Sequence, residues 1–200
     1  MDIDIYKSFV YSKKNSLSKE LCEQIITIHN NDETKQDGST LGGVNKNVKD
    51  TTDIVINFDS NMYTELQEIL KTELMNTLPQ YINSLPNIQQ YISFFDCNFF
   101  IEIFIIQKYD KNKGKYIYHN DSKIDYTNKK YRMFTFIWYL NDVYEGGETE
   151  FINFKIIPEK GKLLIFPATF VFPHCGNTPI SDDKYILTGW IYSSHFERFS

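Results

Sequence analysis

Two histidines and one aspartate in the C-terminal half of the chain have the residue types of a metal-binding centre. His119 and Asp121 are separated by one residue, and His174 follows much later. Residues i and i+2 of a β-strand point to the same face, so His119 and Asp121 can share a cavity to which another strand brings His174. Two imidazoles and one carboxylate form the facial ligand set of non-haem Fe(II), which leaves coordination positions open for oxygen and substrate.

A lysine follows the second histidine and could complete this site. Lys184 is a single cation that could hold the far carboxylate of a dicarboxylate co-substrate. A lysine in an apolar cavity is costly unless it is paired, so an anion would be favoured to bind there. The same ligand set also suits a hydrolytic zinc site. Taken alone, the lysine is more readily explained as a solvated strand end, and the whole site could belong to a non-catalytic jelly-roll binding module.

Composition narrows the class of protein. With 200 residues, the chain is expected to form one domain, in which residues 1–90 are a helical support region and residues 91–200 the catalytic core. Aromatic residues make up 16%, which favours a β-rich core. A net charge of −5 argues against a nucleic-acid partner. The oligomeric state is left open.

Cysteine usage and hydropathy predict a cytoplasmic protein. The three cysteines are odd in number and widely spaced, which is typical of reduced thiols. The first residues include early acids and no apolar segment of the kind found in signal peptides. The most apolar run, residues 99–106, is too short to span a bilayer as a helix, so no membrane association is expected.

The first 90 residues contain two helical patterns. Apolar residues at three- and four-residue steps predict a helix over 17–29, capped by Ser18, and a second over 61–85. Pro79 predicts a break or kink in the second helix. Residues 30–50 are polar and glycine-containing, which indicates an exposed loop with a short strand near 43–48, and residues 52–58 have a β-like pattern.

The remaining residues read as short strands separated by turns. The expected strands are 91–108, 115–118, 131–140, 149–154, 162–166, 169–175 and 185–192. Helices followed by many short strands predict an α+β chain with a double-stranded β-helix (jelly-roll) core and N-terminal helices packed on its major sheet. Strands distant in sequence lie side by side in a jelly roll, so the long separation of His174 from His119 is no obstacle.

Three linked motifs resemble a known family. Residues 131–151 are similar to the signature R-x-x-T-x-x-x-Y-L-N…G-G-E-T-x-F of 2-oxoglutarate- and Fe(II)-dependent dioxygenases of the prolyl 4-hydroxylase type. Residues 158–167 resemble the P-x-x-G-x-x-x-x-F segment of the same family, and residues 174–190 resemble its H…P-V…[KR]-Y-x-L-T-x-W ending. The resemblance covers about residues 109–192, with the motifs in the family's order.

The resemblance implies a role for each matching residue. The metal ligands would be His119, Asp121 and His174. The carboxylate of the co-substrate 2-oxoglutarate (2OG) would be bound by Lys184, Tyr109 and Thr188. Positions near the substrate and the mouth of the cavity would be taken by Arg132, Trp190 and Tyr116. An aspartate at the carboxylate-ligand position argues against halide binding.

The same resemblance implies an enzyme that hydroxylates a C–H bond with Fe(II) and 2OG, and it raises ascorbate as a further cofactor. The expected substrate is a prolyl residue in a peptide or protein. A hydroxylase of a free amino acid or other small molecule is the first alternative, and a nucleic-acid demethylase of the superfamily is disfavoured by the acidic chain. The motifs bind parts that all members share, so they leave the substrate open.

Overall fold

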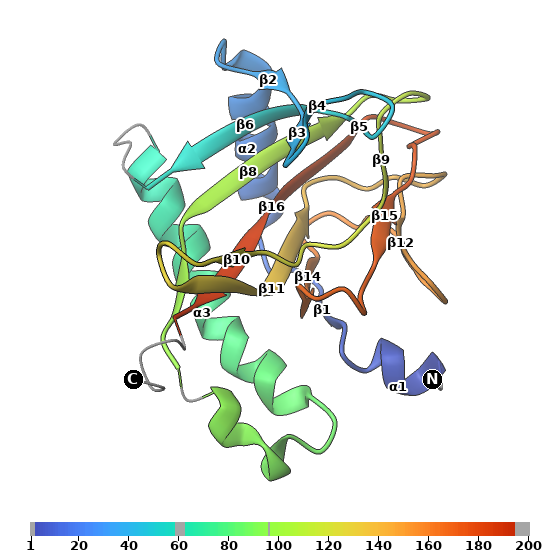
Figure 1. Cartoon of the computed structure of the whole chain (residues 1–200). Helices are drawn as coiled ribbons and strands as arrows, with labels where there is room; N and C mark the ends of the chain where they lie inside the picture. The colour runs from blue at the N-terminus through green and yellow to red at the C-terminus, as the bar shows by residue number, and fades with distance from the viewer. Residues whose placement is uncertain (1–2, 59–62, 96, 195–200) are drawn as a thin grey trace.

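The computed structural model describes residues 3–58, 63–95 and 97–194 and contains two facing antiparallel sheets (Figure 1). The path of the major sheet is β1-β14-β11-β16-β8-β6-β2, and off this path β10 pairs with β11 and β7 pairs with β16. Its long central strands are β11 (Lys130–Tyr139), β16 (Lys184–Ser193) and β8 (Ile103–Tyr109). The other members are β1 (Tyr11–Lys13), β2 (Gln36–Asp37), β6 (Thr52–Asn57), β7 (Phe99–Ile101), β10 (Ile124–Asp125) and β14 (Leu163–Pro167).

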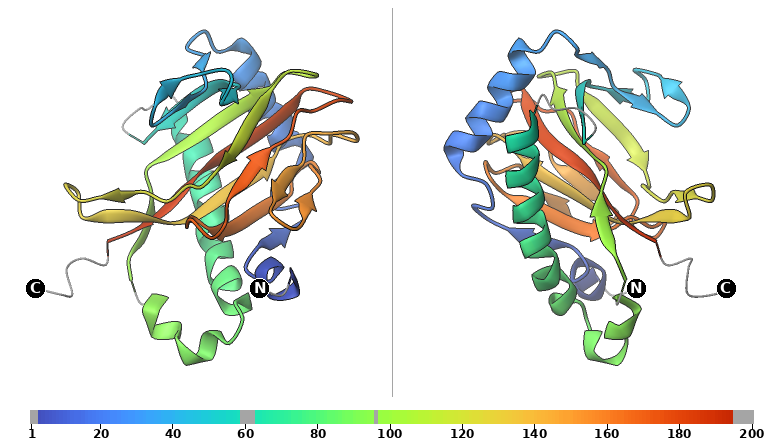
Figure 2. Two further views of the ribbon diagram at one scale, coloured as in Figure 1. Left: turned by 45° about the vertical axis from the view of Figure 1, so that its right-hand side comes forward. Right: turned by 90° about the vertical axis from the view of Figure 1, so that its left-hand side faces the viewer.

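The minor sheet is built from shorter strands in the order β13-β12-β15-β9-β5. These are β5 (Lys49–Asp50), β9 (Lys115–His119), β12 (Thr149–Phe151), β13 (Lys155–Ile156) and β15 (His174–Gly176). A separate two-stranded hairpin consists of β3 (Ser39–Thr40) and β4 (Gly43–Val44). Figure 2 shows the two sheets from two further sides. The arrangement confirms the predicted double-stranded β-helix.

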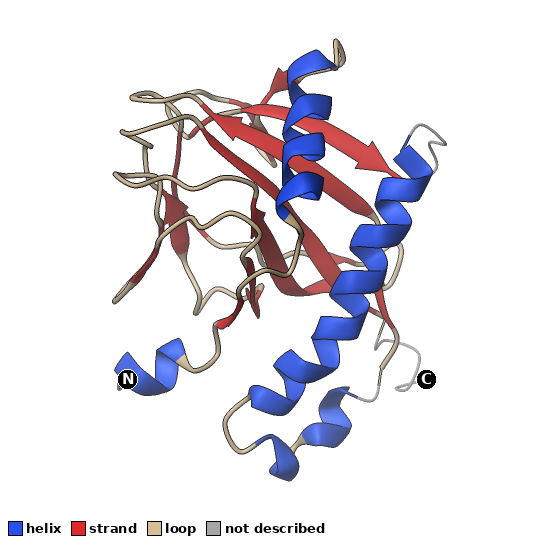
Figure 3. Ribbon diagram, turned by 180° about the vertical axis from the view of Figure 1, so that it is seen from behind, coloured by secondary structure: helices blue, strands red, loops and turns tan. Residues whose placement is uncertain are grey.

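Two helices cover the outer face of the major sheet, as predicted (Figure 3). Helix α2 (Lys19–Asn31) begins at the predicted cap, where the Ser18 side chain accepts a hydrogen bond from the Leu21 amide. It buries Cys22, Ile25 and His29. A third, short helix, α1 (Ile3–Lys7), lies at the N-terminal end.

Of the break or kink predicted at Pro79, the break is wrong. Helix α3 runs from Thr64 to Ser84 through the proline, while residues 61 and 62 lie outside the described part of the chain. Proline removes one backbone donor from a helix. Here the helix continues because residues on both sides of Pro79 are anchored in the core, among them Leu74, Leu78 and Tyr81.

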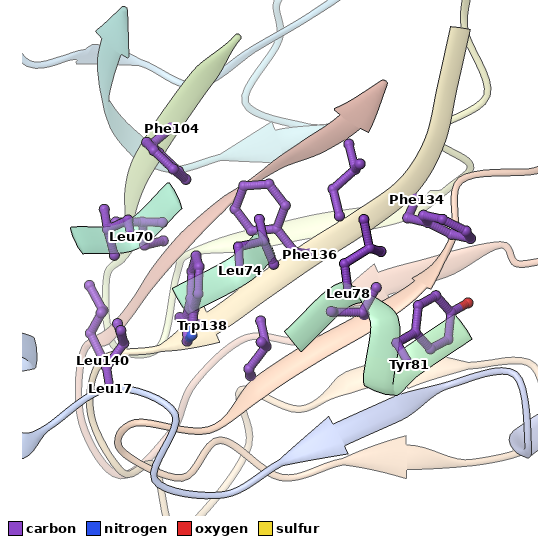
Figure 4. Packing of buried hydrophobic residues seen from close by; sticks show 14 of the residues in the cluster. Leu17, Leu70, Leu74, Leu78, Tyr81, Phe104, Phe134, Phe136, Trp138 and Leu140 are labelled. Atoms are coloured by element: carbon purple, nitrogen blue, oxygen red, sulfur yellow. The ribbon is translucent and has the colours of Figure 1, made fainter. Parts of the chain in front are cut away.

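The core between α3 and the major sheet is aromatic-rich, as the composition suggested. Figure 4 shows Leu70, Leu74, Leu78 and Tyr81 of the helix facing the aromatic side chains of the sheet. Tyr81 packs edge-on against Phe134 with ring centroids 5.0 Å apart. Trp138 is fully buried in this core, and its indole N–H donates to the Ser16 hydroxyl at 3.0 Å. Packing on this side holds β11 and β16, whose opposite faces supply site residues.

Two predicted strands begin later than their patterns suggested. Within residues 88–95 the chain forms two 3-10 turns, Ile88–Gln90 and Ile92–Phe95, before β7 begins at Phe99. Residues 169–173 form a turn, so β15 begins only at His174. Tyr91 and Phe95 pack against the core from the 3-10 turns. Aromatic residues are also typical of buried strands, so these residues were predicted to belong to a strand. The short strands β1, β2, β3, β5, β10 and β13 were not predicted, whereas β4 lies within the short strand predicted near 43–48.

Candidate metal centre and co-substrate pocket

The three predicted metal ligands meet at one point of the minor sheet. His119 ends β9 and His174 begins β15, and the two are direct cross-strand partners. The Nε2 atom of His119 lies 3.9 Å from Asp121 Oδ1, and that of His174 lies 3.6 Å from Asp121 Oδ2. All three potential ligand atoms lie within 4.8 Å of one another. Ligands at right angles, about 2.1 Å from one ion, would be about 3 Å apart, so a small inward movement completes the site.

Hydrogen bonds prepare both imidazoles to act as ligands. The Nδ1 atom of His119 lies 2.9 Å from the Ile117 carbonyl, and that of His174 lies 3.1 Å from the Phe172 carbonyl. A carbonyl only accepts, so each Nδ1 carries the proton and each Nε2 keeps its lone pair for a metal. Such outer hydrogen bonds fix the tautomer and the ring orientation of metal-binding histidines. The donor set therefore fits a divalent ion, and Fe(II) bound by a facial triad leaves positions open for other ligands.

The carboxylate ligand is held by Thr135, the threonine of the R-x-x-T motif, which was not predicted as a site residue. Thr135 of β11 donates its hydroxyl hydrogen to Asp121 Oδ2 at 2.7 Å. Burial alone would raise the pKa of Asp121, but His174, His119 and this hydroxyl hold it below its usual value. The carboxylate therefore stays ionised and oriented.

His119 is protected from protonation by its surroundings. Burial and the neighbouring His174 lower its pKa to about 4, so the ring is neutral at physiological pH. Tyr116 stacks on it with ring centroids 3.6 Å apart and planes 16° apart. The predicted residue at the mouth of the cavity thus forms one side of the metal centre.

Lys184 lies at the end of the cavity predicted to hold the co-substrate. Its side chain is 1% exposed, and its Nζ atom lies 4.6 Å from the ring centroid of Tyr109, its cross-strand partner. Among the described residues, no carboxylate lies within ion-pairing distance of this ammonium group. Burial lowers its pKa to about 7, with Glu148 opposing the change. A buried cation without a counter-ion is a site for an anion.

Thr188, the third residue predicted to bind the co-substrate, uses its hydroxyl in a hydrogen bond within the sheet. Thr188 faces the same cavity, and its hydroxyl donates to the Phe136 carbonyl at 2.7 Å. Its lone pairs remain available, but its hydrogen is already used within the sheet. The Tyr139 ring, 5.9 Å from Lys184 Nζ, was not singled out from the sequence, although it stands in the Y-L-N segment of the motif.

Arg132 and Trp190 form a stacked pair on the cavity wall. The guanidinium carbon lies 3.3 Å from the centroid of the Trp190 ring, which is a close cation–π contact. Arg132 also donates from Nη1 to the Asp121 carbonyl at 3.4 Å. Two buried N–H groups of this pair, Arg132 Nε and Trp190 Nε1, have no acceptor among the described residues.

A single cavity of about 460 Å³ connects these groups, and all nine predicted site residues line it. Its wall also contains a buried polar cluster that the sequence did not suggest, formed by Lys49, Asp53 and Gln107. All three precede the family-like motifs, and their types and spacing carry no recognised pattern. Only their convergence in the fold identifies them.

The comparisons with solved structures agree with this architecture. A prolyl hydroxylase from Trichoplax adhaerens in complex with a hypoxia inducible factor peptide fragment matches with a TM-score of 0.71 and 17% identity over 98% of this chain and 90% of that one. A Pseudomonas putida prolyl-4-hydroxylase matches with a TM-score of 0.64 and 16% identity, covering 94% of each chain. The viral collagen prolyl hydroxylase of Paramecium Bursaria Chlorella virus-1, in its 2OG complex, gives 0.63 and 20% over 92% of this chain and 96% of that one.

Fold and site together define a double-stranded β-helix protein with a His-Asp-His facial triad. Residues 104–192 match the model of the 2OG-Fe(II) oxygenase superfamily, and this stretch contains all nine predicted site residues. The chain therefore contains a region of that superfamily, with the metal-binding triad of an Fe(II)- and 2OG-dependent oxygenase. No sequence among curated proteins matches it significantly. None of the described helices is long and apolar enough to cross a membrane.

Proposed function

We propose that this oxygenase hydroxylates a prolyl residue in a peptide or protein. The observation that carries the proposal is the pair of buried, unpartnered N–H groups of Arg132 and Trp190 beside the metal centre. Buried donors are normally satisfied, so the substrate is expected to supply the missing acceptors. Peptide carbonyl groups on either side of a prolyl ring would do so.

The walls of the cavity fit such a substrate. Ile103, Ile105 and Val55 line the cavity from the major sheet, together with Leu41 of the β3–β4 hairpin, which is 82% exposed. An apolar wall beside two N–H donors favours a ring of carbons flanked by carbonyl groups over a charged substrate. The solved prolyl hydroxylases share this fold at 16–20% identity, and one of them holds a peptide fragment, which supports the choice of a peptide.

The residues of the chain would have distinct roles in this reaction. When bound, Fe(II) and 2OG would activate O₂ for C–H hydroxylation, so that one oxygen atom enters the substrate and the other enters succinate, which forms with release of CO₂. His119, Asp121 and His174 would hold the metal, and Lys184 would bind the far carboxylate of 2OG. Arg132 and Trp190 would place the substrate against the open side of the metal. Buried aromatic side chains around the triad exclude water from the reacting groups.

The decisive experiment is succinate release from 2OG with Fe(II), with and without ascorbate, in the presence of candidate substrates. Proline-containing peptides should stimulate turnover and gain one oxygen atom by mass spectrometry. Free amino acids, single-stranded nucleic acids and alanine-for-proline versions of the same peptides should not. His174→Ala serves as the control and should abolish all turnover. Stimulation by a non-peptide alone would overturn the prolyl assignment. The oxygenase class would be unaffected, because it does not depend on the identity of the substrate.

A further inference from the structure

A buried ion pair lies in the cavity wall where the chain crosses from one sheet to the other. Lys49 belongs to β5 of the minor sheet and Asp53 to β6 of the major sheet. Lys49 Nζ lies 2.6 Å from Asp53 Oδ2, and each side chain is only 6% exposed. The pair therefore spans the two sheets between which the metal and the co-substrate are expected to bind.

Asp53 sets the orientation of a neighbouring amide. Its carboxylate also accepts a hydrogen bond from the Thr51 hydroxyl at 2.7 Å and one from Gln107 Nε2 at 3.1 Å. A carboxylate only accepts, so the nitrogen of the Gln107 amide must face Asp53 and its oxygen must face away. That oxygen accepts from the Tyr109 hydroxyl at 3.5 Å, and the Tyr109 ring lies beneath Lys184.

Lys49 reaches the metal side of the cavity. It is the cross-strand partner of Tyr116, and its Nζ atom lies 5.5 Å from the centroid of that ring. Tyr116 in turn stacks on His119. The ion pair thus contacts Tyr116, which stacks on a metal ligand. Through Gln107 it is also linked to Tyr109, whose ring packs against Lys184.

A preceding part of the chain, residues 38–42, lies against the pair. The Gly38 amide donates to the Thr51 carbonyl at 2.9 Å. A Cβ atom at Gly38 would lie 2.1 Å from Thr51 Oγ1 and 3.0 Å from Lys49 Cε, so a larger residue would have to displace this cluster. Ser39, Thr40, Leu41 and Gly42 follow directly and line the cavity.

We propose that Lys49 and Asp53 are positioning residues for the 2OG pocket, acting through Gln107 and Tyr109 on Lys184. A buried ion pair often contributes no more to stability than a well-packed apolar pair would, so stability alone does not account for it. Fixing the Gln107 amide keeps Tyr109 in place beneath the ammonium group that the co-substrate must reach. The inference depends on membership of the 2OG-Fe(II) oxygenase superfamily and not on the prolyl substrate.

The test compares three variants by calorimetric titration of 2OG into the protein loaded with Mn(II) as a redox-inactive stand-in for iron. Lys49→Met/Asp53→Leu removes both charges, and Gln107→Leu removes the bridging amide while leaving the ion pair intact. Lys13→Met/Glu73→Leu is the matched control, because Lys13 Nζ and Glu73 form a part-buried pair at 2.8 Å on the helix side of the major sheet. Thermal unfolding of each variant measures the cost to the fold separately.

Both test variants should weaken 2OG binding about ten-fold, which is the lower end of the loss seen when residues that orient metal-site groups are replaced. The control variant should bind 2OG as the native chain does. Because the ion pair acts through Gln107, combining all three substitutions should weaken binding no more than Gln107→Leu alone. Native affinity in both test variants, additive losses, or an equal loss in the control would each overturn the inference. Absence of 2OG binding by the native chain would contradict the enzyme class itself.

Discussion

Lys184 Nζ lies 4.6 Å from the ring centroid of Tyr109, and the two residues face each other across neighbouring strands of the major sheet. The electron-rich ring face partly stabilises the ammonium group without neutralising its charge. A cation held in this way remains available to an anionic ligand. This pairing explains how a lysine that is 1% exposed can stay in the cavity before the co-substrate binds.

Replacing this lysine should reduce 2OG affinity without harming the fold. Lys184→Met keeps most of the volume and removes the charge. Hydrogen bonds to charged groups contribute about 1.5–3 kcal/mol, so KM for 2OG should rise roughly 10- to 150-fold. Steady-state kinetics measure the change, and the unfolding temperature should stay level or rise because a buried charge is removed. An unchanged KM would show that another group binds the carboxylate.

The lowered pKa of Lys184 predicts a pH dependence of 2OG binding. In the free protein burial lowers the pKa from 10.5 to about 7, so the lysine loses its proton as pH rises above that value. Binding of an anion favours the charged form, so binding above pH 7 should take up a proton and become weaker as pH rises. Calorimetry in buffers of different ionisation enthalpy detects this proton. The uptake should be absent in Lys184→Met.

The same shift predicts how the stability of the free protein changes with pH. Between pH 7 and 10.5 the unfolded chain holds a proton on Lys184 that the folded chain has lost, so this group makes stability rise with pH across that window. Saturating 2OG should flatten the rise, because the bound lysine keeps its proton. Denaturant unfolding at several pH values, with Lys184→Met for comparison, measures the contribution.

Removing the hydroxyl that holds Asp121 should weaken metal binding. Thr135→Val preserves shape and deletes the 2.7 Å hydrogen bond to the carboxylate. Loss of such a partner typically reduces metal affinity by about 10- to 100-fold. Titration with Mn(II) or Co(II) gives the dissociation constant directly. Thr77→Val, at a buried threonine of α3, is the control and should leave metal affinity unchanged.

A substitution at Trp190 separates hydrogen bonding from stacking. Trp190→Phe keeps an aromatic face for Arg132 but removes the unpartnered Nε1–H. With one hydrogen bond contributing about 1 kcal/mol, KM for a peptide substrate should rise about five-fold. KM for 2OG should stay as in the native enzyme. If KM for 2OG changed and KM for the peptide did not, Trp190 would bind the co-substrate and not the peptide substrate.

The proline inside α3 should reduce the stability of the fold. Pro79 is exposed and lies five residues before the end of a 21-residue helix. Proline in an exposed helix interior is about 3 kcal/mol less favourable than alanine. Pro79→Ala should therefore raise the free energy of unfolding by up to about 3 kcal/mol in urea titrations, with no effect on 2OG turnover. A loss of stability would mean that the packing of α3 requires the proline.

The sequence by itself determined those features that depend on the type and spacing of residues close together in the chain. His119, Asp121, His174 and Lys184 stand at motif positions, and Ser18 caps its helix through contacts within a few residues. These features follow from nearby residues, so their pattern can be read along the chain.

Only the tertiary structure decided the rest. Whether α3 continues through Pro79 depends on anchors provided by a distant sheet, and the pairing of His119 with His174 depends on the register of two strands far apart in sequence. The Lys49–Asp53 pair beside Gln107 exists only because β5 and β6 join different sheets at the edge of the cavity. The stability of such contacts depends on burial and on partners that folding brings together, and neither is encoded in the spacing of the residues themselves.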